Sequence, residues 1–443
     1  NPEFIIYDPG YIATVDGKGV PNSYFGYLVD LKAHHPGVPL MVTEFGLPSS
    51  FGVAHVNPNA WDHGGYNEEE QAVFVTEIFD NIVDAGAAGA VVFEWIDEWF
   101  KRTWVTNPTM LPADRGRLWY DVLSPEESFG LVAYYPVPGW SLRVDGDPSD
   151  WQALGETLVD QPAAASAPRG DGKDAHRTLV KLAAHADPAF LFLRVDTAAV
   201  GKIATDEVVL LIGISTAGGD TGGRRWPDVD LNNPASLGLE NLVVVDGAKE
   251  RFELLTEASY DPTPRLNGMK PSGGVPVSNE DGSFQLSAWL INNNAQYIAE
   301  GKEVAAEKRY YQPGVLRWGD SGVDTLAHGQ LGPNGVLELR LPWHALWVTD
   351  PSGRHVLWDD PATAGFDAVT TDGLRIMVVA AARQPDGSLV VVDALPREAL
   401  QGGGFVTDKV PLFSWPIWDT VTSQERMKPA VQTLGDAFRQ RGT

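Results

Sequence analysis

The chain of 443 residues contains no cysteine, which excludes disulfide bonds, thiolate metal sites and a cysteine nucleophile. Its 33 basic residues are far outnumbered by 59 acidic ones, giving a formal net charge of −26. This balance argues against partners that need a basic surface, namely nucleic acid and anionic membranes. The sequence has no run of 18 or more apolar residues that would span a bilayer. Together these features favour an extracellular or cell-envelope location.

The length predicts two or three domains, and a hydrophobic content of 43% is ample for their cores. The first residue is Asn1, and no signal-peptide pattern follows it. We therefore expect the natural start of the protein to lie further upstream.

Residues 1–139 alternate between helical and strand patterns. An apolar run at 38–45 predicts a strand buried on both faces. Asn67 and Glu70 form a capping-box pattern that begins a helix ending near Gly86, and a second strand follows at Gly89. This order predicts a β-α-β unit with parallel strands.

A closed (β/α)₈ barrel needs about 250 residues, whereas residues 1–139 supply only two such strands. We expect this region to be the C-terminal part of a TIM barrel, with the missing N-terminal part of the same protein as its partner.

From residue 140 the pattern changes to short alternating runs broken by Gly, Pro, Asn and Asp, which predicts an antiparallel β-sandwich over 140–420. A C-terminal segment, 421–443, is expected to hold a helix, Ser423–Phe438, that packs back on the first domain. The predicted strands are Ser141–Val144, Leu179–Ala183, Phe190–Val195, Val208–Ile214, Leu242–Val245, Phe284–Leu290, Val336–Leu341, Leu374–Val379 and Leu389–Asp393.

Glu44 follows the first buried strand, at the strand end where barrel enzymes place their chemistry. A retaining glycosidase needs two carboxyl groups about 5–5.5 Å apart, one attacking the sugar and one protonating the leaving oxygen. The alternative for Glu44 is a structural carboxylate in an ion pair.

The motif Val42-Thr-Glu-Phe-Gly46 resembles the seventh-strand nucleophile motif of the glycoside hydrolase clan that includes families 2 and 5. Val91-Val-Phe-Glu-Trp95 is similar to the eighth strand of those barrels, and the run on to Trp104 is similar to uncharacterised bacterial envelope proteins. The resemblance implies that Glu44 is the nucleophile and Trp95 a stacking platform for the sugar.

The clan's general acid follows the fourth strand, and this chain has no such segment. Glu94 is the nearest substitute, but strand alternation predicts that it faces away from the side of Trp95. The chain alone is therefore expected not to hydrolyse glycosides.

Four residues on the loop after the second strand are candidates for substrate binding, because carboxylates bond sugar hydroxyls and indole faces stack on sugar rings. They are Asp97, Glu98, Trp99 and Trp104. The alternative is structural: the two tryptophans pack under the loop, and the acids pair with Lys101 and Arg102. His55, His63 and Tyr66 lie on the loop after Glu44, where they either reach the same cleft or belong to a surface loop.

The run Val144-Asp-Gly-Asp-Pro-Ser-Asp-Trp151 resembles the opening of family 9 carbohydrate-binding modules, which implies a sandwich that binds carbohydrate. Asp228, Asp230 and Asn232 alternate as the first ligands of a calcium loop do, but the expected glycine and glutamate are missing. A structural calcium and a solvated loop both remain open, and no other cofactor is expected.

Two functions fit these patterns. The first is part of a retaining glycoside hydrolase acting on an extracellular or cell-envelope polysaccharide. The second is a non-catalytic carbohydrate-binding or structural surface protein with a degenerate barrel. A haem-binding sandwich finds little support, because no Met/His ligand pair is evident.

Overall fold

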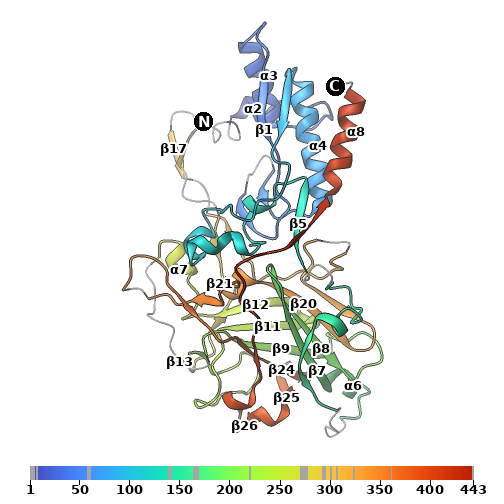
Figure 1. Ribbon diagram of the computed structural model, residues 1–443, viewed down its shortest axis with the longest axis vertical. Coiled ribbons are helices and arrows are strands. Elements are labelled where there is room, and N and C mark those ends of the chain that lie inside the picture. Colours follow the sequence, from blue (N-terminus) through green and yellow to red (C-terminus); the bar gives the residue numbers. More distant parts are fainter. Residues whose placement is uncertain are drawn as a thin grey trace.

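A two-stranded parallel sheet and the helix that connects its strands frame the first half of the molecule (Figure 1). The computed structural model describes residues 5, 8–56, 61–137, 142–162, 169–218, 221–269, 278–291, 296–299, 302–305, 308–322, 325–360 and 362–441. Strand β1 (Met41–Phe45) runs parallel to β4 (Gly89–Val92), and Phe45 pairs with Val92. The parallel β-α-β unit expected from the sequence is confirmed.

Helix α4 (Glu68–Asp84) begins with the capping box expected from the sequence. The Asn67 side chain accepts a hydrogen bond from the Glu70 N–H at 2.9 Å, and the Glu70 carboxylate accepts one from the Asn67 N–H at 2.8 Å. The apolar side of the helix is buried, and Phe79 stacks against Phe45 of β1 with ring centroids 6.3 Å apart. Hydrophobic packing thus fixes β1 and β4 on one side of α4.

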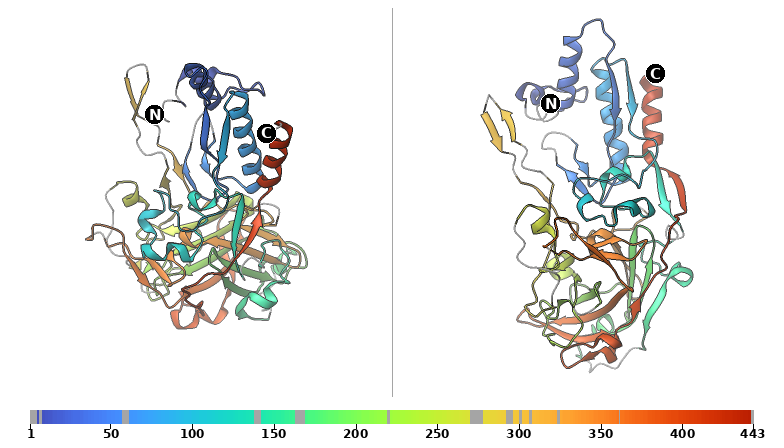
Figure 2. Two further views of the ribbon diagram at one scale, coloured as in Figure 1. Left: turned by 45° about the horizontal axis from the view of Figure 1, so that its top comes forward. Right: turned by 60° about the vertical axis from the view of Figure 1, so that its left-hand side comes forward.

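The end of the chain returns to this first half. Strand β29 (Ser423–Met427) pairs antiparallel with β5 (Val132–Pro136), and α8 (Pro429–Arg441) packs against α4. Rings of Phe438 and Phe79 lie 4.3 Å apart. The predicted packing of a terminal helix is confirmed, but residues 423–427, expected in that helix, form a strand. Figure 2 shows α8 beside α4 in both views.

The two largest sheets in the described part of the second half are antiparallel. One has the order β14-β12-β11-β9-β24-β25, with β28 also paired to β24, and the other has the order β19-β20-β8-β7-β6. Apolar residues of both sheets belong to one buried cluster, so the sheets pack face to face as in a sandwich. Their strands are β6 (Glu156–Asp160), β7 (Leu179–Ala186), β8 (Phe190–Thr197), β9 (Val208–Ser215), β11 (Asn241–Asp246), β12 (Arg251–Glu257), β14 (Phe284–Gln285), β19 (Gly329–Gly332), β20 (Val336–Pro342), β24 (Leu374–Arg383), β25 (Leu389–Leu395) and β28 (Leu412–Phe413).

Two of the predicted sandwich strands differ from the structure. Residues 142–144 are not a strand, and residue 141 lies outside the described residues. The predicted strand Phe284–Leu290 is divided into β14 and β15 (Trp289–Leu290), which pair with different partners.

The other elements are short. Helices are α2 (Pro9–Ala13), α3 (Ser23–His34), α5 (Trp151–Leu154), α6 (Asp174–Arg177) and α7 (Thr263–Leu266). Turns of 3₁₀ helix are η1 (Asn107–Thr109), η2 (Ala113–Leu118), η3 (Pro125–Ser128), η5 (Gly247–Lys249), η6 (Trp343–Leu346), η7 (Arg397–Ala399) and η8 (Thr407–Lys409). Strands are β2 (Val53–His55), β3 (His63–Gly64), β10 (Gly222–Gly223), β13 (Ser278–Asn279), β16 (Gln296–Ala299), β17 (Lys302–Ala305), β18 (Tyr310–Tyr311), β21 (Val348–Asp350), β22 (His355–Leu357), β23 (Ala368–Thr370), β26 (Leu400–Gln401) and β27 (Gly404–Phe405).

The hydrophobic core runs across the junction of the halves. Phe51, Met110 and Trp119 of the first half belong to the same buried cluster as the sandwich sheets. His344 of the sandwich also links the two halves, because its ring forms hydrogen bonds with Thr109 Oγ1 and Asp121 Oδ2, both at 2.8 Å. The predicted boundary at residue 139 therefore marks a change in the sequence pattern, but the hydrophobic core continues across it.

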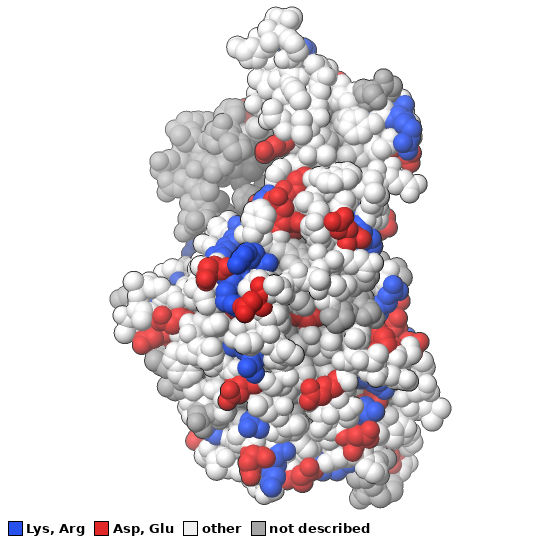
Figure 3. Space-filling view, in the orientation of Figure 1, with Lys and Arg blue, Asp and Glu red and all other residues white. Residues whose placement is uncertain are grey.

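Within the described residues, the parallel sheet of the first half has two strands and forms no closed barrel. None of the described helices has the length and apolar character needed to cross a membrane. In the face shown in Figure 3, acidic and basic side chains are interspersed over the sandwich, and the tip that holds α2 and α3 shows few charges.

Candidate functional site

Glu44 lies at the carboxyl end of β1, beside the parallel strand β4. Its neighbour Phe45 is buried against α4, whereas Glu44 itself is exposed. Among the described residues it has no hydrogen-bond or ion-pair partner. The ion pair that would make Glu44 a structural carboxylate is therefore not seen in the described part of the chain, and its oxygens are available to a ligand.

Exposed aromatic side chains follow β4. Trp95 is 59% exposed, Trp104 is 48% exposed and Phe100 is 62% exposed. Trp95 and Trp104, both singled out from the sequence, thus present ring faces that suit stacking, and Phe100 adds a third ring that sequence reasoning had passed over.

Asp97 and Trp99 are turned into the protein. Asp97 is 3% exposed, and its Oδ1 accepts hydrogen bonds from Lys428 Nζ at 2.8 Å and from the Gly130 N–H at 2.9 Å. Burial raises the pKa of Asp97 to about 6, although Lys428 opposes the shift. Trp99 stacks on Tyr120 with ring centroids 5.6 Å apart. Both side chains are therefore used in intrachain contacts, as in the structural alternative. Asp97 pairs with Lys428, however, and not with Lys101 or Arg102.

Glu98 and Glu94 share one lysine. Lys101 Nζ lies 3.0 Å from a carboxylate oxygen of each acid and 4.1 Å from the centroid of the Phe93 ring. Burial raises the pKa of Glu94 to about 7, against the lowering effect of Lys101. Strand β4 ends at Val92, so the alternation used to orient Glu94 does not extend to it. Lys101 contacts both Phe93 and Glu94, which shows that these neighbours share a side.

Of the three residues predicted on the loop after β1, His55 and His63 lie on the short strands β2 and β3, and His63 and Tyr66 have local side-chain partners. His63 Nε2 lies 3.2 Å from Glu126 Oε1, and this contact lowers the pKa of Glu126. The Tyr66 hydroxyl accepts a hydrogen bond from the Asp62 N–H at 2.9 Å, and His55 is exposed. None of these contacts involves Glu44.

The proposed calcium ligands are not arranged as a metal site in the described residues. Asp228 Oδ2 pairs with Arg251 Nη1 at 2.8 Å, and Asp230 is exposed. No group of three or more metal-ligating acids or histidines occurs in the part of the chain that the structure describes. A calcium ion remains a prediction from the sequence.

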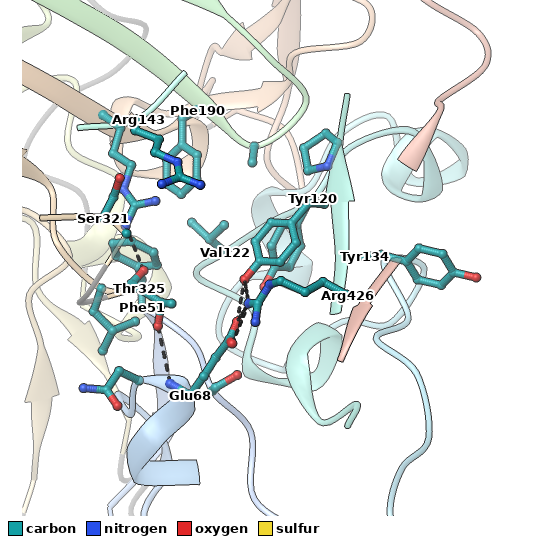
Figure 4. A pocket seen from close by; sticks show the side chains of 18 of the residues that line it. Phe51, Glu68, Tyr120, Val122, Tyr134, Arg143, Phe190, Ser321, Thr325 and Arg426 are labelled. Carbon is teal, nitrogen blue, oxygen red and sulfur yellow. Dashed lines mark hydrogen bonds and ion pairs between the residues drawn. The ribbon is translucent and has the colours of Figure 1, made fainter. Parts of the chain in front are cut away.

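A cavity of about 310 Å³ lies between the two halves, lined by residues that follow β1 and β4, the start of α4, the sandwich loops and the β29–α8 turn. Figure 4 shows Arg143, Ser321 and Thr325 on one side of it, with Tyr120 and Arg426 opposite. Glu68 accepts hydrogen bonds from Arg426 and from the Tyr135 hydroxyl, and its N–H donates to Thr325 Oγ1 at 3.4 Å. Sequence reasoning missed this site because its walls come from segments far apart along the chain.

Comparison of the chain with protein-family models and with curated proteins finds no match.

Proposed function

We propose that this chain is the C-terminal part of a retaining (β/α)₈ glycoside hydrolase that acts on an extracellular or cell-envelope polysaccharide, with Glu44 as the nucleophile. The observation that carries the proposal is the position of Glu44. It is exposed, has no intrachain partner among the described residues, and lies at the carboxyl end of β1 beside a parallel strand that leads to the exposed Trp95.

In the proposed reaction Glu44 attacks the anomeric carbon while a second carboxyl group protonates the departing glycosidic oxygen. Water then displaces Glu44 from the glycosyl-enzyme intermediate and releases the sugar. Trp95 and Trp104 would stack on sugar rings next to this carbon. The proton donor would come from the N-terminal part of the barrel, which would also supply the missing strands.

Exposed apolar side chains support the need for further strands. On and before β1, Met41 and Val38 are each 55% exposed, and Val91 of β4 is 46% exposed. Parallel sheets in α/β proteins are normally covered on both faces. Helix α4 covers one side of β1 and β4, so the remaining barrel strands would cover the other.

A non-catalytic carbohydrate-binding or structural surface protein is the second candidate. It is favoured by the exposed rings of Trp95, Phe100 and Trp104, which need no proton donor to stack on sugars. In this alternative Glu44 accepts hydrogen bonds from sugar hydroxyls and breaks no bond.

The decisive experiment uses the protein and its variants purified from the natural host, each identified by intact mass and N-terminal sequencing. A 2-deoxy-2-fluoroglycosyl fluoride series should label the peptide that contains Glu44 and leave a stable glycosyl ester. Glu44→Gln should abolish both labelling and turnover, whereas Glu156→Gln, which changes an exposed glutamate on β6, should preserve both. Labelling of another residue, or turnover by Glu44→Gln, would disprove the nucleophile. Sugar binding without labelling would support the second candidate.

A further inference from the structure

The cavity between the two halves is lined by buried and charged side chains, and the proposed hydrolase reaction does not involve it. Its volume of about 310 Å³ is at the lower end of the range for small-molecule sites. Its walls combine aromatic rings, including Phe190 and Tyr120, with charged side chains of both signs. Such a mixture offers both stacking faces and hydrogen-bonding groups to one ligand.

Three buried carboxyl groups line this cavity, and Asp97 and Asp187 are the two that do not pair with Arg426. Asp97 uses Oδ1 for its bonds to Lys428 and Gly130. Asp187, which is 5% exposed, uses Oδ1 for the N–H groups of Ala189 and Phe190, both at 2.7 Å. In both residues Oδ2 makes none of these bonds. A buried polar atom normally has a partner, so each Oδ2 is suited to bond a ligand in the cavity.

Hydrogen-bond donors also line the cavity. Ser321 Oγ accepts from the Val144 N–H at 2.9 Å, and Thr325 Oγ1 accepts from the Glu68 N–H. Each hydroxyl still carries its own proton to donate. The exposed Arg143 guanidinium lies on the same side (Figure 4), and guanidinium groups only donate.

The charges of the cavity select the class of ligand. Arg426 neutralises Glu68, and Lys428 neutralises Asp97. An anion would face Asp187 and the exposed Glu69, and a cation would face Arg143 and Arg340, all of which line the cavity. A neutral ligand with several hydroxyl groups avoids both conflicts and matches the donors and acceptors on the walls.

We propose that this cavity binds a neutral monosaccharide or disaccharide, with its hydroxyls bonded to Asp187 and Arg143 and a ring face against the aromatic wall. The site is separate from Glu44 and does not depend on the proposed hydrolase activity.

Isothermal titration calorimetry with D-glucose, D-galactose, D-mannose, cellobiose and D-glucuronate tests the proposal on the full chain. At least one neutral sugar should bind. Arg143→Ala and Asp187→Asn should each weaken that binding at least about tenfold, because each loses a hydrogen bond that involves a charged or buried group. Asparagine keeps the Oδ1 acceptor for Ala189 and Phe190.

Matched variants separate this site from the strand-end site. Arg117→Ala removes an exposed arginine outside the cavity and should leave the affinity unchanged, whereas Glu44→Gln and Trp95→Ala should affect only sugar binding at the strand-end site. Should Asp187→Asn fail to fold, Arg143→Ala still decides, because Arg143 is exposed. The proposal is overturned if no neutral sugar binds, if glucuronate binds more tightly than glucose, or if Arg143→Ala binds as the wild type does.

Discussion

Lys428 joins the end of the chain to the ends of both parallel strands. It is 3% exposed, and its ammonium donates to Asp97 Oδ1 at 2.8 Å, to the Ser128 carbonyl at 3.0 Å and to Ser49 Oγ at 3.1 Å. Lys428→Met keeps an unbranched side chain of similar length but removes all three bonds. It leaves Asp97 buried without its cation. Breaking a buried pair in this way costs about 3–5 kcal/mol.

The pH dependence of that cost follows from the pKa of Asp97. Burial raises this pKa to about 6 in the folded protein, above its value in the unfolded chain. The stability contributed by the raised pKa is therefore present below about pH 4 and is lost as the pH rises through 6. Without Lys428 the pKa rises further, so Lys428→Met should cost more stability at pH 7 than at pH 5.

Urea unfolding followed by tryptophan fluorescence at both pH values measures this cost. Lys409→Met, which changes an exposed lysine, is the control and should unfold as the wild type does. Adding Asp97→Asn to Lys428→Met should recover part of the loss at pH 7, because it removes the stranded acid. A cost below about 1 kcal/mol at pH 7, or an equal cost at both pH values, would refute the reasoning.

Three further predictions concern the junction, the parallel sheet and the cavity. His344→Phe should lower the free energy of unfolding by about 3 kcal/mol, because Thr109 and Asp121 lose their buried partner; an unchanged melting temperature would contradict this. Gly46→Ala should destabilise the protein by several kcal/mol, because its Cβ would lie 1.7 Å from the Phe93 carbonyl oxygen. Gly435→Ala on α8 is the control. Its Cβ would meet nothing closer than 3.8 Å, so it should be neutral or stabilising by up to about 1 kcal/mol. Burial raises the pKa of Asp187 to about 7, so the free energy of unfolding of the wild type should fall by up to about 4 kcal/mol between pH 4 and pH 7. In thermal melts, the stability of Asp187→Asn should depend less on pH. A pH profile identical to that of the wild type would exclude Asp187 as the titrating group.

Local patterns predicted the elements whose own residues set their type. The helix after Asn67 followed from its capping box and apolar spacing, and the structure places it at Glu68–Asp84. The long strands β8, β9 and β24 followed from apolar runs that the two sheets bury. In these cases an element's own residues indicated its type, although its neighbours can be distant in sequence, as β24 is from β9.

Predictions were weakest where a distant segment decides the outcome. Residues 423–427, four of which are polar, were assigned to a helix, but β5, about 290 residues earlier, holds them as a strand. Asp97 was predicted either to bind substrate or to pair with a neighbouring base, and it pairs with a lysine 331 residues away. The sequence identifies such residue types without showing which segments will meet.

The return of β29 and α8 to the first half sets an order for folding during synthesis. Helix α4 and strand β5 cannot gain their last neighbours until residues 423–441 have left the ribosome. The strands of the two antiparallel sheets, all contained within residues 156–413, emerge before that. Because domains generally fold as units during synthesis, the sandwich should be formed while the earlier-made half still waits for its closing strand and helix.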